Sequence, residues 1–277
     1  MSLSLIPPSD FNAVVTRLRS FFQGKGFVEV HTQNRLSILA ACEDPKTVAT
    51  YNYPDDCNSS LLWPLPQTGQ MWLEYELLKN PSLPGVFCVS TSYRNEPNPV
   101  PGRHLRIFPM FEFESHGTME DLIKLEKELV THLGFKNYLE VDYQETAKEF
   151  NVKELENQHE EELNKKSNVV FLENFPEYTS PFWNMKRSAN TAKKVDVIIH
   201  GMETIGSAER SCDKNDMKNR FDTISNGEYA QLLYNLFTKE RVQKEMEEFL
   251  NLNFIPRYGG GIGITRLIRG MKLSKII

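Results

Sequence analysis

The stretch from Ser92 to Glu114 permits few backbone conformations. Its centre, residues 97–102, reads Pro-Asn-Pro-Val-Pro-Gly. This centre cannot be helical, because each proline fixes φ and lacks the amide proton of a helical hydrogen bond. The residues that follow, Phe108–Phe113, are largely apolar and aromatic, which favours a strand. We therefore predict two antiparallel arms joined by a long turn.

This hairpin would gather charged and aromatic side chains on one ribbon. It carries two arginines, a histidine and a phenylalanine near the turn: Arg94, Arg103, His104 and Phe108. Guanidinium groups suit phosphate, and a ring suits the face of a purine, so the ribbon has the groups that an ATP site needs. A surface hairpin with ordinary charges is the alternative, because short motifs are weakly specific.

Composition and charge exclude several classes of protein. The chain has 277 residues, 40% of them hydrophobic and 25% charged, with a net charge of −5. These values are typical of a globular protein of one large or two small domains and give no general preference for nucleic acid. No stretch approaches the ~18 apolar residues of a membrane span. Reduced thiols in a cytoplasmic protein are favoured over zinc or disulfides, because no Cys-x-x-Cys pair occurs among Cys42, Cys57, Cys88 and Cys212.

Helical and extended patterns alternate irregularly along the chain. Helices are predicted at 11–22, 71–79, 119–133, 227–236 and 238–252, and strands at 27–30, 85–90, 169–172, 195–199 and 259–264. Because regular βαβ alternation is lacking, we predict an α+β fold with a mainly antiparallel sheet and helices packed on it. Residues 144–167 are densely charged and are predicted to form a solvated helical insertion.

Two further clusters suggest a polyphosphate site. Residues 259–266 form a glycine-rich strand that ends at Arg266, and glycines in a strand admit close approach of a ligand or another backbone. This is neither a dinucleotide fingerprint nor a P-loop. Asp196 stands in an apolar run, and Glu203 and Arg210 flank a small-residue turn. Such carboxylates commonly hold magnesium beside phosphates, although a buried salt bridge between Glu203 and an arginine is an equal alternative.

Taken together, these segments resemble the catalytic domain of class II aminoacyl-tRNA synthetases, in the aspartate, asparagine and lysine subgroup. Residues 21–32 resemble the family's motif 1, the opening hairpin resembles motif 2, and residues 259–266 resemble motif 3. The matches are collinear and span roughly residues 11–271. The resemblance implies a single α+β catalytic domain over residues 1–277, with an antiparallel sheet of six to seven strands flanked by helices. It also implies a homodimer that forms through residues 11–36.

Within this subgroup the chain is most similar to asparaginyl-tRNA synthetase. Residues 68–74 resemble that enzyme's Ser-Gly-Gln-Leu-x-x-Glu segment, and Leu73 stands where the aspartyl enzyme has a lysine for the substrate carboxylate. The resemblance implies that Glu74 accepts a hydrogen bond from a side-chain amide and that Arg210 contacts its carbonyl. It also implies that Glu43, after Cys42, binds the α-amine.

The resemblance also assigns roles to the other polar residues. The catalytic residues would be Arg94 and Arg266. ATP would be bound by Arg94, Glu96, Arg103, His104, Phe108, Glu203 and Arg266. The amino acid would be bound by Glu43, Gln70, Glu74, Glu112 and Arg210. Mg²⁺ would be held by Glu203 and Asp196.

Several departures from the family pattern leave the acceptor of the activated amino acid open. The motif 1 helix is expected near residue 10, so no anticodon-binding domain precedes it, and Thr265 stands where motif 3 usually has an acid. The first expectation is an ATP-dependent ligase that activates asparagine or a relative, with binding of tRNA undecided. The alternatives are an asparagine synthetase, which would capture an aspartyl adenylate with ammonia, and a non-catalytic binding module.

Overall fold

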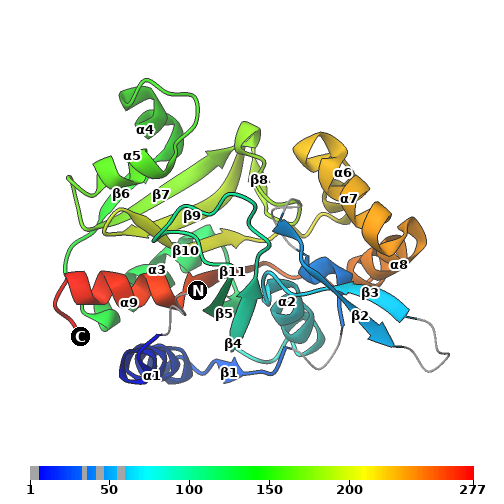
Figure 1. Ribbon diagram of the computed structural model, residues 1–277, viewed down its shortest axis with the longest axis horizontal. Coiled ribbons are helices and arrows are strands. Elements are labelled where there is room, and N and C mark those ends of the chain that lie inside the picture. Colours follow the sequence, from blue (N-terminus) through cyan, green and yellow to red (C-terminus); the bar gives the residue numbers. More distant parts are fainter. Residues whose placement is uncertain (1–5, 33–35, 42–46, 55–59) are drawn as a thin grey trace.

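The computed structural model describes residues 6–32, 36–41, 47–54 and 60–277, and a large mixed sheet forms its centre (Figure 1). The sheet has nine strands, in the order β1-β4-β5-β11-β10-β9-β7-β6, with β8 paired to β9. Their bounds are β1 Val28–Glu29, β4 Gly85–Tyr93, β5 Ile107–His116, β6 Leu139–Asp142, β7 Val169–Pro176, β8 Arg187–Ser188, β9 Thr191–Ile199, β10 Met202–Glu209 and β11 Arg257–Gly263.

This architecture confirms the predicted α+β class and the mainly antiparallel sheet. Among the described strands only two pairs are parallel, β1 with β4 and β6 with β7, and both lie at the ends of the sheet. The sheet is larger than the six to seven strands predicted. The strands that were not predicted are β6, β8 and β10. Strand β8 has only two residues, too few to show a period in the sequence. The segment between Glu203 and Arg210, which was expected to be a small-residue turn, instead belongs to strand β10 in the middle of the sheet.

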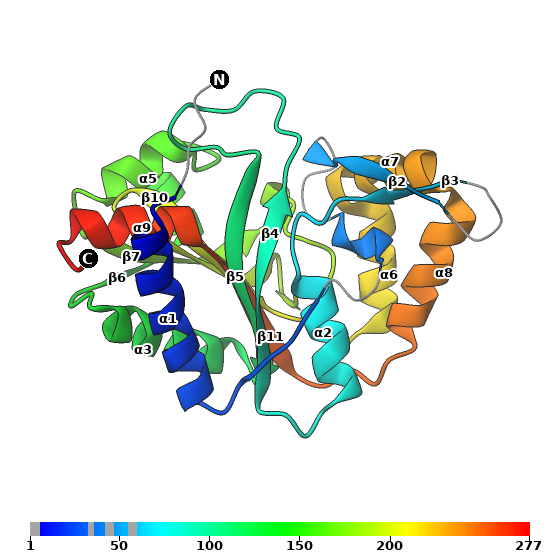
Figure 2. The same cartoon turned by 60° about the horizontal axis from the view of Figure 1, so that its bottom comes forward.

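Helices cover both sides of the sheet (Figures 1 and 2). Their bounds are α1 Pro8–Gly24, α2 Gln70–Lys79, α3 Met119–Leu133, α4 Tyr143–Glu149, α5 Asn157–Leu163, α6 Lys214–Thr223, α7 Glu228–Phe237, α8 Lys239–Leu250 and α9 Ile264–Leu273, and the short 3₁₀ turns are Ile38–Ala40, Glu177–Thr179 and Ile224–Gly227. Among the described helices, none is long and apolar enough to span a membrane.

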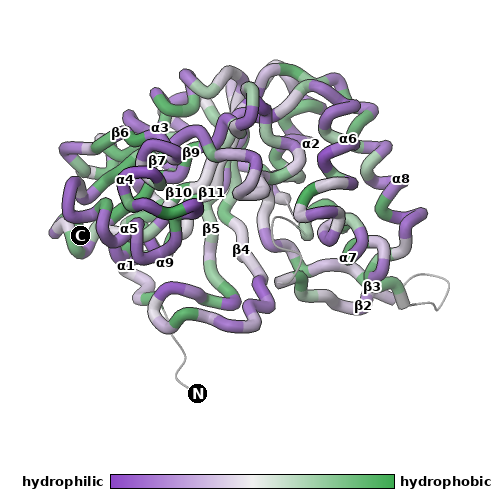
Figure 3. The backbone as a smooth tube through the Cα atoms, turned by 90° about the horizontal axis from the view of Figure 1, so that it is seen from above, coloured by the Kyte–Doolittle hydropathy of each residue, from purple (hydrophilic) through white to green (hydrophobic). Residues whose placement is uncertain are grey.

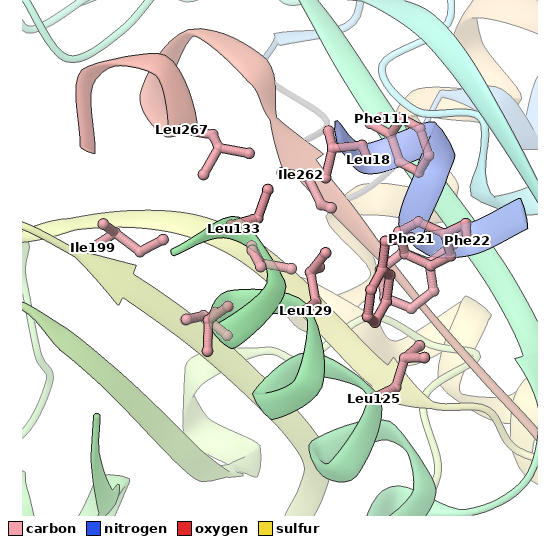
Figure 4. Close-up of a cluster of buried hydrophobic side chains, with 14 of the residues drawn as sticks. Leu18, Phe21, Phe22, Phe111, Leu125, Leu129, Leu133, Ile199, Ile262 and Leu267 are labelled. Atoms are coloured by element: carbon pink, nitrogen blue, oxygen red, sulfur yellow. The ribbon is translucent and has the colours of Figure 1, made fainter. Parts of the chain in front are cut away.

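The main hydrophobic core lies between the sheet and the helices α1, α3 and α9 (Figure 4). Phe22 of α1 packs on Phe111 of β5 with ring centroids 5.1 Å apart, and Phe87 of β4 stacks on Phe111 at 5.0 Å. Leu129 of α3 and Leu267 of α9 complete the cluster with no exposed surface. Burial of each such side chain stabilises the fold by about 1.5–3 kcal/mol. The two strands of the hairpin, β4 and β5, are therefore held firmly against this core.

A second core joins α2, the helices α6, α7 and α8, and a separate two-stranded hairpin, β2 Thr50–Pro54 with β3 Ser60–Pro64. The side chains of Trp183, Phe221 and Tyr229 pack edge to face at its centre. Helix α8 alternates hydrophilic and hydrophobic segments along its length (Figure 3), as an amphipathic surface helix does. This core forms one flank of the cavity described below.

The charged segment 144–167 folds mostly into helices α4 and α5. Tyr143, Ala147 and Leu163 pack onto β7 and β9 in a smaller apolar cluster. Glu160 of α5 turns towards the motif 2 hairpin and pairs with Arg103. The segment therefore contributes a wall to the central face of the sheet.

Glu126 of α3 is a buried carboxyl group beneath the sheet, and it predicts a pH dependence of stability. It is fully buried and accepts a hydrogen bond of 2.6 Å from the Ser207 hydroxyl. Burial, reinforced by the negative charges of Asp196 and Glu173, raises the pKa of Glu126 to about 8 from its ordinary 4.5. Between these two values the folded protein holds a proton that the unfolded chain releases. The contribution of Glu126 to the free energy of unfolding therefore falls by about 1.4 kcal/mol per pH unit as pH rises from 4.5 to 8.

We expect Glu126→Gln, whose side chain is neutral at every pH and similar in shape, to lose this dependence of the free energy of unfolding on pH. The melting temperatures of the wild type and the variant, measured from pH 5 to pH 8, should diverge steadily in favour of the variant. Parallel curves would show that Glu126 ionises at its ordinary pKa in the folded protein.

Candidate active site

A cavity of about 430 Å³ opens over the central strands of the sheet. Strands β5, β9, β10 and β11 form its floor, α2 forms one wall, and the α4–α5 segment with residues 179–185 forms the other. The predicted site residues that line it are Gln70, Arg94, Glu112, Asp196, Glu203 and Arg210. They come from segments up to 140 positions apart in the sequence, such as Gln70 and Arg210, whose side chains contact each other.

The motif 2 hairpin has the predicted form and places Arg94 at the cavity. Strands β4 and β5 pair in register from Gly85 opposite Ser115 to Tyr93 opposite Ile107. Beyond this ladder the Arg94 amide donates to the Arg106 carbonyl at 2.7 Å. The guanidinium carbon of Arg94 lies 5.7 Å from the centre of the Phe108 ring. This is a cation–π contact, and it holds the arginine beside the ring predicted to stack on adenine.

The remaining cations of the predicted phosphate site gather around Glu203. Arg103 pairs with Glu160 at 2.5 Å, and Glu160 also accepts the Glu203 amide at 2.8 Å. Arg266 donates to the Glu203 carbonyl at 2.6 Å and lies 3.7 Å from its carboxylate. Burial alone would raise the pKa of Glu203, but Lys194, Arg266, Arg94 and Arg103 together lower it, so this carboxylate stays ionised.

Asp196 and Glu203 converge because of an irregularity in β10. The pairing of β10 with β9 shifts between Glu203 and Ile205, which inserts one extra residue. Such a bulge turns the strand, so Glu203 and Gly206 share one face although they are three residues apart. A methyl group on Gly206 would lie 3.0 Å from Glu203 Oε1 and 3.5 Å from Asp196 Oδ1. The two carboxylates therefore meet over a glycine.

This pair of carboxylates fits the Mg²⁺ predicted from the sequence. Asp196 is 7% exposed, and its Oδ1 is buried without a hydrogen-bond partner among the described residues. Its other oxygen pairs with Lys194. In the part of the chain that the structure describes, no group of three or more His, Cys, Asp and Glu side chains is arranged to hold a metal. Mg²⁺ is commonly held by one or two carboxylates together with substrate phosphates and water, and that is the arrangement these residues allow.

The glycines of β11 are required by side chains that cross this strand. A methyl group on Gly259 would lie 1.7 Å from Glu114 Oε2, and one on Gly260 would lie 2.5 Å from the Ser207 Cβ. The Gln70 amide nitrogen also reaches the Gly260 carbonyl at 2.8 Å. The sequence indicated a close approach at this strand, and the groups that approach it are Glu114, Ser207 and Gln70.

Glu112 and Gln70 are fixed by short local contacts. Glu112 is fully buried and accepts hydrogen bonds from the Gly69 amide at 2.8 and 2.9 Å and from the Thr68 and Ser90 hydroxyls. These bonds tie the start of α2 to the floor of the cavity. Gln70 Oε1 accepts a hydrogen bond from Arg210, which joins α2 to the end of β10.

The position of Glu74 differs from the one implied by the resemblance. Glu74 is fully buried and does not line the cavity. Its Oε2 accepts two hydrogen bonds from Arg257, which is equally buried, and its Oε1 accepts one from Asn184. Leu73 also lies away from the cavity, in an apolar cluster with Leu77. Neither residue of α2 is placed to touch a substrate directly, because the chain fills their surroundings with its own partners.

Arg210 lines the cavity, and it has partners that the sequence did not indicate. It is 5% exposed and donates to Glu114 from Nε and Nη2 at 3.3 Å each. Burial raises the pKa of Glu114 to about 7, and the positive charge of Arg210 opposes this shift. Glu114, Arg257 and Asn184 were not predicted as site residues. Glu114 ends the motif 2 segment, but Arg257 and Asn184 carry no motif that would have identified them.

The other predicted ATP-binding residues lie outside the walls of the enclosed cavity. These are Glu96, Arg103 and His104 on the turn of the hairpin, Phe108 at the start of β5, and Arg266 at the start of α9. Burial lowers the pKa of His104, although nearby Glu96 opposes the shift. Glu43, the predicted ligand of the α-amine, lies outside the described residues, as do Cys42 and Cys57. Cys88 is a buried free thiol and Cys212 an exposed one.

Solved structures of similar fold include two kinds of synthetase. Asparaginyl-tRNA synthetase from Pyrococcus horikoshii, complexed with asparaginyl-adenylate, has a TM-score of 0.74 at 20% identity and matches 97% of this chain and 65% of its own. Asparaginyl-tRNA synthetase from Entamoeba histolytica, also with asparaginyl-adenylate, has a TM-score of 0.72 at 16% identity with the same coverage.

Aspartyl-tRNA synthetase from Entamoeba histolytica has a TM-score of 0.68 at 19% identity and is matched over 54% of its chain. This chain thus spans about half to two thirds of these proteins, and their identities support the fold alone. A search of curated proteins gave no match. The family model for class II tRNA synthetases (D, K and N) matches residues 10–277, and the chain therefore belongs to that family.

Proposed function

We propose that this chain activates asparagine, or a close relative, with ATP. The reaction would form an aminoacyl adenylate and release pyrophosphate. The observation that carries the proposal is the convergence of Arg94, Gln70, Arg210 and the Asp196–Glu203 pair on one cavity. The asparaginyl-adenylate bound by two proteins of the same fold supports it.

In the proposed reaction, the carboxylate of the amino acid attacks the α-phosphorus of ATP in line. A bond forms between a carboxylate oxygen and phosphorus, and the bond to pyrophosphate breaks. The carboxylate is already ionised, so no general base is needed. The contribution of the protein is to position the reactants and to stabilise the developing charge. Arg94 would be the cation for this task, and its position at the cavity, 5.7 Å from the centre of the Phe108 ring, supports that role.

The remaining polar groups would bind the ends of ATP. Arg103, His104 and Arg266 would hold the β- and γ-phosphates, while Phe108 stacks on adenine and Glu96 accepts its amine. Asp196 and Glu203 would hold Mg²⁺, which would neutralise phosphate charge when bound. The ionised state of Glu203 and the buried Oδ1 of Asp196 support this assignment.

The amino acid would lie deeper, over β11 and beside α2. Arg210, Gln70 and Glu112 line this part of the cavity, and Glu43 would bind the α-amine. Glu74 would affect the substrate indirectly, by holding Arg257 and Asn184 in position, because both residues already donate hydrogen bonds to its carboxylate.

The chain would form a homodimer through residues 11–36. Strand β1 is an edge strand, and its Val28 is 41% exposed, which supports a pairing surface there.

Exchange of labelled pyrophosphate into ATP tests the proposal, with asparagine, aspartate and lysine supplied singly and with none. We expect exchange that depends on asparagine. Exchange with aspartate alone, accompanied by ammonia-dependent formation of asparagine, would identify an asparagine synthetase instead. Absence of exchange with every amino acid would indicate a binding module.

A further inference from the structure

We propose that Asn184 selects a side-chain carboxamide over a carboxylate in the substrate, an inference that rests on the proposed activation of an amino acid. Asn184 lies between the 3₁₀ turn at Glu177–Thr179 and strand β8. It lines the cavity and is 1% exposed.

The backbone of Asn184 is fixed beside the end of β10. Its carbonyl accepts the Ser211 amide at 2.8 Å, and the adjacent Met185 forms a bridge with Arg210. Asn184 and Arg210 therefore stand together in one wall of the cavity. Their relative position does not depend on a flexible loop, since both backbones are tied to the sheet.

Glu74 fixes the orientation of the Asn184 amide. Asn184 Nδ2 donates to Glu74 Oε1 at 2.5 Å and lies 3.6 Å from the Met71 sulfur. A carboxylate that is paired with Arg257 through its other oxygen can only accept here, so the NH₂ group must face Glu74. Asn184 Oδ1 is then the one polar atom of this side chain that a ligand can use.

That oxygen lacks a partner in the part of the chain that the structure describes, and it is buried. A buried acceptor left unpaired costs about 1–3 kcal/mol, which a ligand that donates a hydrogen bond would recover. A carboxamide offers such a donor in its NH₂ group. A carboxylate offers only acceptors. It would therefore face another acceptor, the Asn184 Oδ1 atom, and the negative charge of Glu74 would be close to its own.

A cation near the same oxygen of Glu74 completes the complement of an amide. Arg210 Nε lies 3.8 Å from Glu74 Oε1, the oxygen that also accepts the Asn184 amide. The guanidinium of Arg210 and the amide of Asn184 thus approach one carboxylate oxygen from the wall of the cavity. A carboxamide whose oxygen faces Arg210 and whose nitrogen faces Asn184 matches both. Sites built to hydrogen-bond a substrate group reject analogues that lack the group far more strongly than apolar pockets do.

Asn184→Leu tests this assignment, because leucine has a similar volume and no polar side-chain atom. In pyrophosphate exchange, kcat/KM for asparagine should fall about 10- to 100-fold. The value for aspartate should stay unchanged or rise, so the ratio between the two substrates collapses. Met185→Leu, which lines the same wall and leaves Oδ1 in place, should keep the wild-type ratio.

Three results separate the possible failures. Equal loss for both substrates would assign Asn184 a structural role or contact with the common α-amine, and would overturn the proposal while leaving amino acid activation intact. A wild type that prefers aspartate would overturn it directly. A wild type with no exchange would remove the proposed function and this inference together. Asn184→Ala replaces the leucine variant if the latter does not fold, as judged by thermal unfolding.

Discussion

Arg94→Ala is expected to lower pyrophosphate exchange by about 10³-fold while the protein remains folded. Arg94 lines the cavity and lies 5.7 Å from the Phe108 ring. In the proposed reaction it stabilises charge that develops on the α-phosphate, and removal of such a group typically costs 10²–10⁵-fold in rate. The side chain is half-buried and outside the apolar cores, so the melting temperature should change little.

Two matched variants sharpen this test. Arg94→Lys keeps the charge and loses the planar fork, and it should recover only part of the rate. Arg106→Ala removes an exposed guanidinium from the same hairpin and should exchange at the wild-type rate. If Arg94→Ala and Arg106→Ala retained equal activity, the assignment of the α-phosphate to this hairpin would be wrong.

Arg257→Met is expected to destabilise the protein by about 3–5 kcal/mol, because it breaks a buried ion pair by removing one partner. Arg257 and Glu74 are both fully buried, and two of the guanidinium nitrogens contact Glu74 Oε2. Arg257 also donates to the Ser211 carbonyl at 3.1 Å. Without Arg257, the Glu74 carboxylate would remain buried with Asn184 and a more distant Arg210. Urea unfolding measures the loss.

The double variant Glu74→Gln with Arg257→Met separates the charge effect from packing. It should recover part of the stability, since no unpaired carboxylate remains. As a control, Lys165→Ala removes one partner of an exposed pair with Glu162 and should cost no more than about 1 kcal/mol. A loss of that small size in Arg257→Met would mean that Glu74 is not held as described.

Local sequence signals predicted the parts of the site that one segment builds. The prolines at 97–101 required a turn, and strands β4 and β5 form the predicted arms on either side. The glycines of β11 indicated a close approach, which the side chains of Glu114 and Ser207 make. In both cases the backbone constraint belongs to the residue itself, so it is visible without the fold.

Long-range partners could not be predicted in the same way. Glu74 was expected at the substrate because residues 68–74 resemble a segment of asparaginyl-tRNA synthetase, but its partner Arg257 is 183 positions away. No periodicity connects two such residues. The sequence gives no signal for Asn184 either. Its proposed role depends on its own Oδ1 atom, which has no partner among the described residues while Nδ2 donates to Glu74.

The origin of the oxygen in AMP tests the central claim most directly. The protein is incubated with ATP, Mg²⁺ and asparagine carrying ¹⁸O in its α-carboxylate, and the nucleotide products are examined by mass spectrometry. Attack of the carboxylate on the α-phosphorus predicts pyrophosphate and AMP with one ¹⁸O atom, after water hydrolyses the adenylate at its carbonyl carbon. Formation of ADP and phosphate, or of AMP without ¹⁸O, would contradict the account.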